Sequence, residues 1–382
     1  MLEKGALDGI KVLDISRLLP GPFCSMILAD HGADVIAIED GTKGPVPLFF
    51  DGVNRNKRHV SLNLKQDEGK EIFYALAKKA DVILEGFRPG VVKRLGVDYD
   101  TIRAMNPGII YCSITGYGQT GPLKEYVGHD VNYLSHAGVL DLIGPSGAPP
   151  SIPGIQVADI AGGSMNAAMG ILLALYAREK SGKGQYIDIS MTDGVAGFLF
   201  LPHHFAKVSG QPQRRSMGML SHRYACYNTY QTKDGKYVAI GAVEHLFWKR
   251  LCELLGQPDY APLQYDEAKR HEIIDWLRRV FLTRSAEDWN QKLSSADVCF
   301  TVVHTLEEVM ESDLFKEREM VAHIPREDES IHTTFGIATK LSETPGTLRS
   351  APVPFGASTQ EVLKELGYSE EKIESFKKNN IV

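Results

Sequence analysis

The first 190 residues of the chain alternate between short apolar segments and segments with helical periodicity. Apolar and β-branched residues predict strands at Ile10–Asp14, Asp34–Ile38, Val60–Leu64, Asp81–Leu84, Gly108–Ser113 and Gln185–Ser190. Helices are predicted between them, at Phe23–His31, Lys65–Lys79 and Asp159–Lys180. Strands that alternate with helices in this way pair in parallel through crossover helices. The pattern therefore predicts an open α/β sheet with a Rossmann-like layout.

The loop after the first predicted strand reads SRLLPGPF and lacks the G-x-G-x-x-G fingerprint of a dinucleotide site. We therefore do not infer NAD from the sheet. Ligands of open α/β sheets bind outside the carboxyl ends of the strands. We expect the functional site of this chain at that edge.

The pattern changes after about residue 220. Two β-prone runs flank Asp234-Gly235 and predict a hairpin, and helical segments and an apolar strand follow. We predict a large α/β domain over residues 1–200, completed by residues 330–382. A linker over 201–224 and a smaller α+β domain over 225–325 complete the predicted organisation.

Composition argues against several classes of protein. The formal net charge of −6 over 382 residues gives no overall electrostatic case for nucleic acid. No segment approaches eighteen uncharged apolar residues and the N-terminus carries acids, so we expect neither a membrane span nor a signal peptide.

The cysteines are scattered, odd in number and without a C-x-x-C motif, which indicates reduced thiols in the cytoplasm. They are Cys24, Cys112, Cys226, Cys252 and Cys299. His203, His204 and His222 lack the spacing of metal ligands, so we predict no metal site.

Asp159 precedes Gly162, Gly163 and Ser164 at the start of a long apolar helix. One interpretation is a helix cap, because a carboxylate accepts hydrogen bonds from the free N–H groups of a helix start. The other is a base or nucleophile, since small residues let a ligand approach a helix N-terminus closely. The two interpretations are compatible.

His129 and Asp130 follow the strand–turn stretch SITGYGQTGP, which leaves the carboxyl end of a predicted strand. A lone histidine is more often structural, but this position favours a functional one. Asp130 could orient His129, or its backbone N–H could donate to an oxyanion. Glu244 lies in an apolar run, either as a helix N-terminal residue or as the partner of a histidine, and the pattern does not decide between them.

Basic residues gather in two stretches, NRNKRHV and EGFRPGVVKRLG. Each is either solvated surface or a grip for phosphate, because Arg and Lys pair well with phosphate oxygens.

Several motifs, in this order, make the chain resemble the family III CoA transferases and, within them, the α-methylacyl-CoA racemases. They are LLPGPFCSMILADHGADVI, NRNKRHVSLNL, DVILEGFRPGVVKRLG, SITGYGQTGP, GHDVNYL, ADIAGGSMNAAMGILLALY and SGKGQYIDISMTDG. The resemblance implies a homodimer of interlocked chains, with each active site between the large domain of one chain and the small domain of its partner. It also implies acyl-CoA substrates whose CoA lies against the large domain.

The resemblance also implies residue roles. Asp159 matches an aspartate that is the nucleophile in transferases and a proton-transfer group in racemases. The histidine of Gly128-His129-Asp130 is the racemase feature, and Glu244 matches a glutamate that holds the catalytic histidine.

Two features depart from the family pattern. His245-Leu246 stand where racemases usually have Pro-Gln, and this difference bears on which acyl groups the site accepts. Glu39-Asp40 stand where many relatives have a basic residue, and Lys43 is the nearest cation. The residues expected to bind CoA are Lys57, Arg58, Arg88, Arg94, Tyr133 and Lys43.

We therefore expect epimerisation of 2-methylacyl-CoA or related thioesters in lipid metabolism, with His129 and Asp159 as the acid–base pair. No prosthetic group is expected, and coenzyme A enters as part of the substrate. The alternatives are CoA transfer between carboxylic acids, with Asp159 as nucleophile, and a non-catalytic protein that binds CoA esters.

Overall fold

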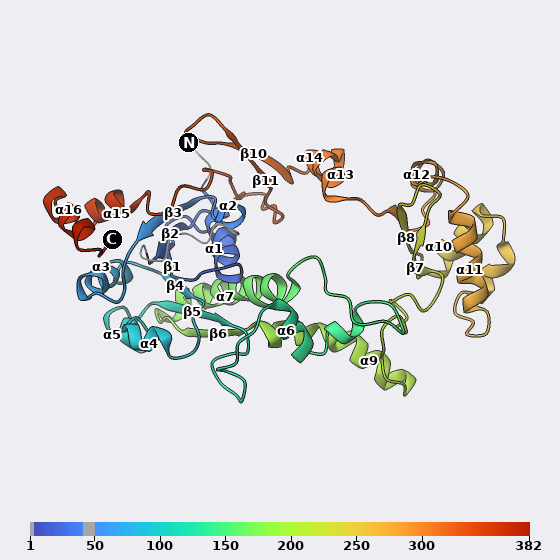
Figure 1. The fold of residues 1–382 in the computed structure, drawn as a ribbon, viewed down its shortest axis with the longest axis horizontal. Coiled ribbons are helices and arrows are strands. Elements are labelled where there is room, and N and C mark those ends of the chain that lie inside the picture. The colour runs from blue at the N-terminus through green and yellow to red at the C-terminus, as the bar shows by residue number, and fades with distance from the viewer. Residues whose placement is uncertain (1–3, 41–49) are drawn as a thin grey trace. The chain divides into compact units, whose positions relative to one another are not determined.

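The structure is a computed structural model that describes residues 4–40 and 50–382 (Figure 1). Lys43 lies outside the described residues. The chain forms two compact units. Unit 1 comprises Met1–Ala137, Gly154–Phe198 and Asp313–Val382, and unit 2 comprises Gly138–Pro153 and Leu199–Ser312.

The centre of unit 1 is a six-stranded sheet in which all neighbouring strands are parallel. The strands are β1 (Lys11–Asp14), β2 (Asp34–Glu39), β3 (Lys57–Ser61), β4 (Val82–Glu85), β5 (Ile110–Thr115) and β6 (Tyr186–Ser190). Their order is β3-β2-β1-β4-β5-β6, so the order reverses between β1 and β4. The predicted open α/β sheet is confirmed, and its reversal point is where such folds hold ligands.

Helices and one hairpin surround the sheet of unit 1 (Figure 1). The helices are α1 (Pro20–Asp30), α2 (Phe50–Val53), α3 (Asp67–Ala77), α4 (Val91–Leu95), α5 (Tyr99–Met105), α6 (Asp130–His136), the π-helix η3 (Ala158–Met165), α7 (Asn166–Ser181), α8 (Met191–Ala196), α14 (Asp313–Glu317), α15 (Thr359–Glu365) and α16 (Glu370–Lys378). The hairpin joins β10 (Val321–Pro325) to β11 (Ile331–Phe335).

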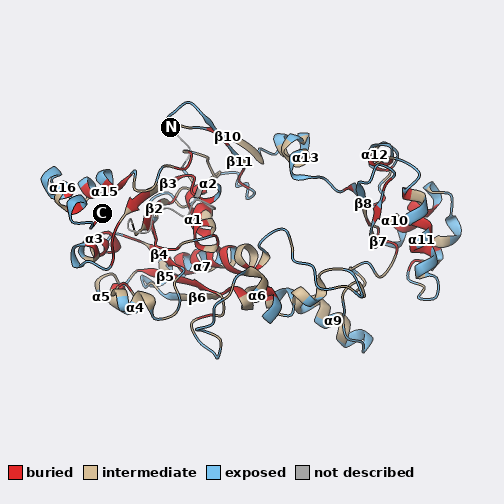
Figure 2. Cartoon of the chain, viewed as in Figure 1, coloured by how far each residue is buried: buried red, intermediate tan, exposed pale blue. Residues whose placement is uncertain are grey.

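Apolar spacing explains how α3 packs on the sheet. Ile72, Phe73 and Leu76 lie on one face of α3 and are buried. The carboxylates of Asp67 and Glu68 in the first turn stabilise the helix, because they interact favourably with the positive end of its dipole. The same apolar core includes side chains of the C-terminal helices α15 and α16. Figure 2 shows these buried faces in red. Each large apolar side chain buried there contributes roughly 1.5–3 kcal/mol to stability.

One continuous helix, Ala158–Ser181, is long and apolar enough to cross a membrane by length and composition alone. The sequence expectation counted only unbroken apolar runs, whereas this test uses mean hydropathy, which tolerates the Ser, Asn and Gly of this helix. A buried core helix passes the same test, and 44% of the most apolar window is buried here. The rest of the helix carries an exposed stripe, which we call the α7 apolar face: Met165, Met169, Leu172, Leu173 and Tyr176.

Unit 2 contains an antiparallel sheet of β7 (Tyr227–Gln231), β8 (Tyr237–Gly241) and β9 (Phe300–Val302). The predicted hairpin at Asp234-Gly235 is confirmed, with Gly235 at φ 81° in the left-handed region. The helical elements of unit 2 are η2 (Leu140–Leu142), α9 (Phe200–Ser209), α10 (His245–Leu254), η5 (Pro258–Leu263), α11 (Arg270–Phe281), α12 (Ala286–Leu293) and α13 (Leu306–Glu311). Its core is built on large side chains that include Trp248, Phe281 and Trp289.

The observed units differ from the predicted domain boundaries. A helix, α9, occupies part of the predicted linker over 201–224, and unit 2 ends at Ser312 rather than near 325. The physical reason for the second difference is the β10–β11 hairpin, because the Arg55 guanidinium of unit 1 donates a hydrogen bond to the carbonyl of Phe335.

Candidate active site

Asp159 lies in the first turn of the π-helix η3, but it does not cap that helix. The carboxylate of Asp130, from the start of α6, accepts hydrogen bonds from the backbone N–H groups of Ala158 (2.6 Å) and Asp159 (3.0 Å). Asp130 therefore fills the capping role that the sequence allowed for Asp159. This use of the Asp130 side chain was not predicted.

The glycines after Asp159 serve close packing. A Cβ on Gly162 would lie 2.6 Å from the carbonyl oxygen of Met191, and one on Gly163 would lie 2.9 Å from the Met191 side chain. Residues without a Cβ therefore let η3 pack tightly on α8. The helix start that carries Asp159 is fixed from both sides, by Asp130 and by α8.

His129, Asp130 and Asp159 form one electrostatic group. The pKa of Asp159 is raised to about 6: burial is the largest cause, the negative charge of Asp130 adds to it, and the charge of His129 acts in the opposite direction. His129 is exposed, and its backbone N–H donates to the Asn132 side chain at 3.0 Å. The structure thus brings together three of the four residues expected to be catalytic, with the histidine open to solvent.

Tyr133 is packed beneath the turn that carries His129. Its hydroxyl donates to the Gly128 carbonyl at 2.5 Å, and its ring fills the space where a Cβ on Gly116 would stand, 2.3 Å away. Only 7% of Tyr133 is exposed, which leaves little of the ring for the predicted contact with CoA. Its structural function is to hold the backbone before His129.

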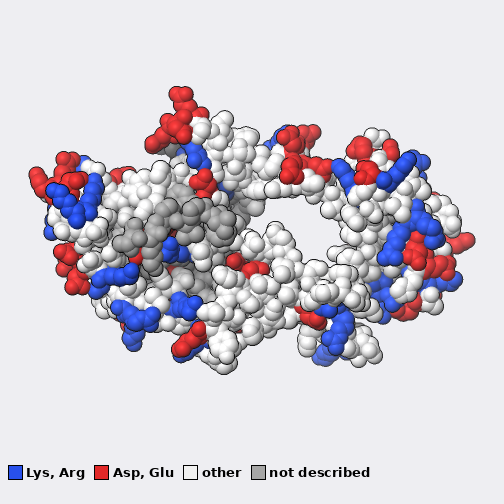
Figure 3. Space-filling view, viewed as in Figure 1, with Lys and Arg blue, Asp and Glu red and all other residues white. Residues whose placement is uncertain are grey.

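Arg88 and Arg94 follow β4 at the reversal point of the sheet. Both are exposed, and Arg94 belongs to the last turn of α4. Burial raises the pKa of Tyr133 to about 12, with the charge of Arg88 acting in the opposite direction. Lys and Arg side chains gather over α4 and α5 at the lower left of Figure 3. These two arginines suit the predicted contact with phosphate.

Lys57 does not suit that contact, and this prediction was wrong. Its side chain is 0% exposed, and its Nζ donates to the Pro22 carbonyl at 2.8 Å and the Asn54 side chain at 3.0 Å. Asp14 Oδ2 lies 3.9 Å away. The predicted strand began at Val60, whereas β3 begins at Lys57, and this places Lys57 within the sheet rather than in a surface loop.

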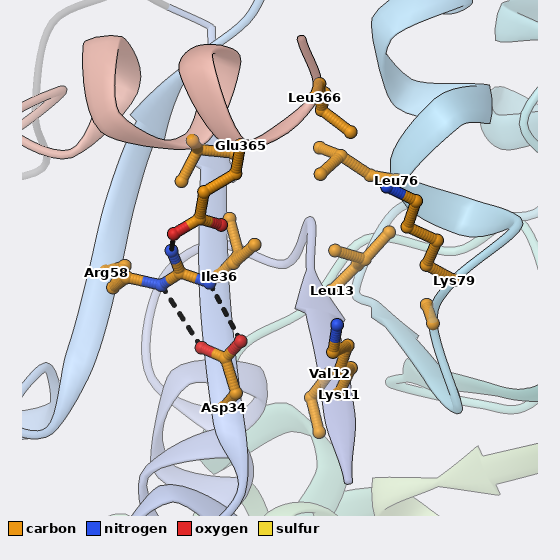
Figure 4. A pocket seen from close by; sticks show the side chains of 12 residues that line it. Lys11, Val12, Leu13, Asp34, Ile36, Arg58, Leu76, Lys79, Glu365 and Leu366 are labelled. Atoms are coloured by element: carbon orange, nitrogen blue, oxygen red, sulfur yellow. Dashed lines mark hydrogen bonds and ion pairs between the residues drawn. The ribbon is translucent and has the colours of Figure 1, made fainter. Parts of the chain in front are cut away.

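Arg58 points to the other face of β3 and is also engaged within the protein (Figure 4). Its guanidinium pairs with both oxygens of Asp34, at 3.1 and 2.8 Å, and with Glu365 at 2.8 Å. The three residues line a cavity of about 120 Å³ between the start of the strands, α3 and α15. Asp34 is the first residue of β2, so Arg58 lies at the amino ends of the strands, away from the expected ligand edge. Its predicted role in binding CoA was wrong for this reason.

Glu244 belongs to unit 2, where it is the N-cap residue of α10. Its carbonyl accepts from the N–H groups of Phe247 and Trp248 at 3.1 and 3.2 Å, and its side chain is exposed. The helix-start interpretation of Glu244 is therefore confirmed. Its predicted action on a histidine stays a prediction.

The chain matches the family model of CoA-transferase family III over residues 7–359. It is 37% identical over 380 residues to the α-methylacyl-CoA racemase of Homo sapiens, covering 99% of this chain and 97% of that protein. It is 39% identical over 270 residues to the acetyl-CoA:oxalate CoA-transferase of Acetobacter aceti, covering 68% and 69% of the two chains. A solved CAIB/BAIF family protein from Brucella suis has the same fold, with a TM-score of 0.83, 29% identity, and coverage of 95% and 100%. The chain therefore belongs to CoA-transferase family III.

Family membership confirms the resemblance that the motifs indicated. Because the relatives include both a racemase and a CoA-transferase, membership does not choose between the two reactions. The chemistry of the site has to supply that choice.

Proposed function

We propose that this protein epimerises 2-methylacyl-CoA or related α-substituted acyl-CoA thioesters by proton transfer through an enolate. The observation that carries the proposal is the grouping of His129 with Asp159, whose pKa is raised to about 6 by burial and by Asp130. A carboxyl group that titrates near neutral pH can act either as an acid or as a base there, and it lies beside a histidine, the other side chain suited to proton transfer.

Inversion of the α-carbon requires a proton to leave one face and another to arrive on the opposite face. In one direction neutral His129 takes the α-proton, the electron pair moves into the thioester to form the enolate, and protonated Asp159 returns a proton to the α-carbon. In the reverse direction the Asp159 carboxylate takes the proton and protonated His129 returns one. The enzyme then regains its starting state by working in the opposite direction or by exchange with water.

The enolate oxygen needs a hydrogen-bond donor. The backbone N–H of Asp130 is the first of α6, and the first N–H groups of a helix have no partner within that helix. We assign it to the enolate oxygen, where loss of one such donor typically costs on the order of 100- to 1000-fold in rate. The exposed Arg88 and Arg94, and Lys43, are the residues proposed to contact CoA, which arrives with the substrate.

A second copy of the chain is the proposed partner of the α7 apolar face. An exposed stripe of five large apolar side chains is characteristic of an interface. Interlocked chains would also let Glu244 of a second copy reach His129, and the unpaired cysteines suit a cytoplasmic protein. Sedimentation of the full chain should give the mass of two copies, and Leu173→Glu should give one. A monomeric wild-type protein would contradict the partner.

The second candidate function is CoA transfer to a carboxylic acid, which the Acetobacter aceti relative favours. Asp159 would then be the nucleophile and His129 incidental. The deciding experiment incubates one epimer of a 2-methylacyl-CoA in deuterated water without an acceptor acid. An epimerase incorporates deuterium at the α-carbon and scrambles the stereocentre. A transferase changes nothing until an acid is added, and a non-catalytic binder changes nothing in either case.

A further inference from the structure

Glu85 is a buried acid that the mechanism above does not use. It is the last residue of β4, beside the reversal point of the sheet, and only 1% of it is exposed. Burial of a carboxylate is costly unless hydrogen bonds compensate for the lost water. Its contacts therefore indicate what it is for.

The carboxylate of Glu85 ties two neighbouring elements together. Its Oε2 accepts the backbone N–H of Phe87 at 2.6 Å, which folds the start of the loop after β4. The side chain of Ser113, its register partner on β5, also hydrogen-bonds to it. Ser113 Oγ in turn accepts from the hydroxyl of Tyr186 on β6 at 2.9 Å. The loop is thus anchored to the central strands through one ionisable group.

The anchored loop carries Arg88. The charge of this exposed arginine acts on Tyr133, and Tyr133 holds the Gly128 carbonyl directly before His129. A change in the loop conformation would therefore move a cation of the proposed CoA site that interacts electrostatically with the residue beneath the His129 turn.

We propose that Glu85 is a positioning residue of the acyl-CoA site: its ionised carboxylate fixes the loop over residues 86–90 and so places Arg88 to contact the CoA part of the substrate. The inference rests on the proposed function in assuming an acyl-CoA ligand, but not on the reaction that follows binding.

The protonation state of Glu85 sets how firmly the loop is held. The ionised form accepts from both Phe87 and Ser113, whereas protonation turns one oxygen into a donor. Burial raises the pKa of Glu85 to about 7, with Asp188 raising it and the two hydrogen bonds lowering it. The ionisable groups that face it are Tyr111 and Cys112 on β5 and Tyr186 and Asp188 on β6. Among these, Glu85 is the group expected to change charge near neutral pH, so CoA affinity should rise with pH across about 6 to 8.

The test compares Glu85→Gln with wild type by calorimetric titration of coenzyme A across this pH range. Glutamine keeps the shape and can accept from Phe87, but it cannot ionise. Coenzyme A has its own phosphate titration near pH 6, so the difference between the two proteins is the readout. The variant should bind roughly tenfold more weakly at pH 8, the effect of losing one charge-assisted hydrogen bond, and the affinity gap should close at low pH. In turnover, KM should rise while kcat stays nearly constant.

Two further variants keep the test decisive. Glu68→Gln makes the same chemical change at an exposed site on α3 and should behave as wild type. Arg88→Ala should abolish the effect of Glu85→Gln, because the two residues act in series and their effects are then not additive. A Glu85→Gln protein that folds and keeps the wild-type pH dependence, or an effect that persists in the Arg88→Ala background, would overturn the proposal. Titration of coenzyme A requires no turnover, so the binding result can be interpreted even if the epimerase assay fails.

Discussion

Asp130 holds the backbone of Asp159 while its charge tunes the acidity of the same residue. The Asp130 carboxylate accepts the Asp159 N–H at 3.0 Å and the Ala158 N–H at 2.6 Å. The pKa of Asp159 is raised to about 6, with burial as the largest cause and the negative charge of Asp130 as the second. One side chain thus fixes where the proposed acid stands and helps bring its pKa closer to neutral pH.

Replacing Asp130 with asparagine should separate these two effects. Loss of the charge removes a cause of the raised pKa, so the pKa of Asp159 should fall and the acid limb of the kcat profile should move to lower pH. Asparagine keeps an accepting oxygen, so only the loss of negative charge at the helix N-terminus should lower the free energy of unfolding, by roughly 0.3–1 kcal/mol. Urea unfolding and a pH–rate profile measure the two effects. Asp67→Asn, at the exposed start of α3, should leave the rate profile in place.

Removing either proposed acid–base group should abolish most epimerisation. His129→Ala and Asp159→Ala should each lower kcat roughly 100- to 10,000-fold, the usual contribution of a positioned acid or base. Binding of coenzyme A should remain, because neither side chain is assigned to it. His136→Ala is the matched control, as His136 is an exposed histidine at the end of the same helix, α6. Full epimerase activity in the His129 variant would rule out the two-base mechanism.

Local patterns predicted the sheet because its strands are apolar runs between helices. They also singled out His129 and Asp159, which lie close enough to interact electrostatically. They failed at Lys57 and Arg58, since polar residues in NRNKRHV looked like a surface loop although they belong to β3. The two residues point to opposite faces of a strand, and only its register shows which partners each one meets. The link from Asp130 to Asp159 spans 29 positions, so no local pattern could reveal it.

Substitution by alanine should affect stability at Arg58 and CoA affinity at Arg88. Arg58→Ala breaks the partly exposed ion pairs with Asp34 and Glu365 that tie α15 to the sheet, so stability should fall by about 1 kcal/mol or less with CoA affinity unchanged. Arg88→Ala should weaken coenzyme A binding roughly tenfold with stability unchanged, because an exposed arginine is removed from a phosphate contact. Thermal unfolding and calorimetric titration on both variants test the pair. Loss of CoA affinity in the Arg58 variant alone would reverse our assignment.

Lys57 should make the stability of unit 1 depend on alkaline pH. Burial lowers its pKa from an ordinary 10.5 to about 8. Between these values the unfolded chain binds more protons than the folded one, so the free energy of unfolding should rise with pH across this window, by at most about 3 kcal/mol. Lys57→Met removes the titrating group and should flatten that rise. Urea unfolding at pH values near 8 and near 10 measures it, with Lys70→Met, on α3 and ion-paired with Asp67, as the lysine control. An unchanged slope in Lys57→Met would mean that the pKa of Lys57 is not lowered in the folded protein.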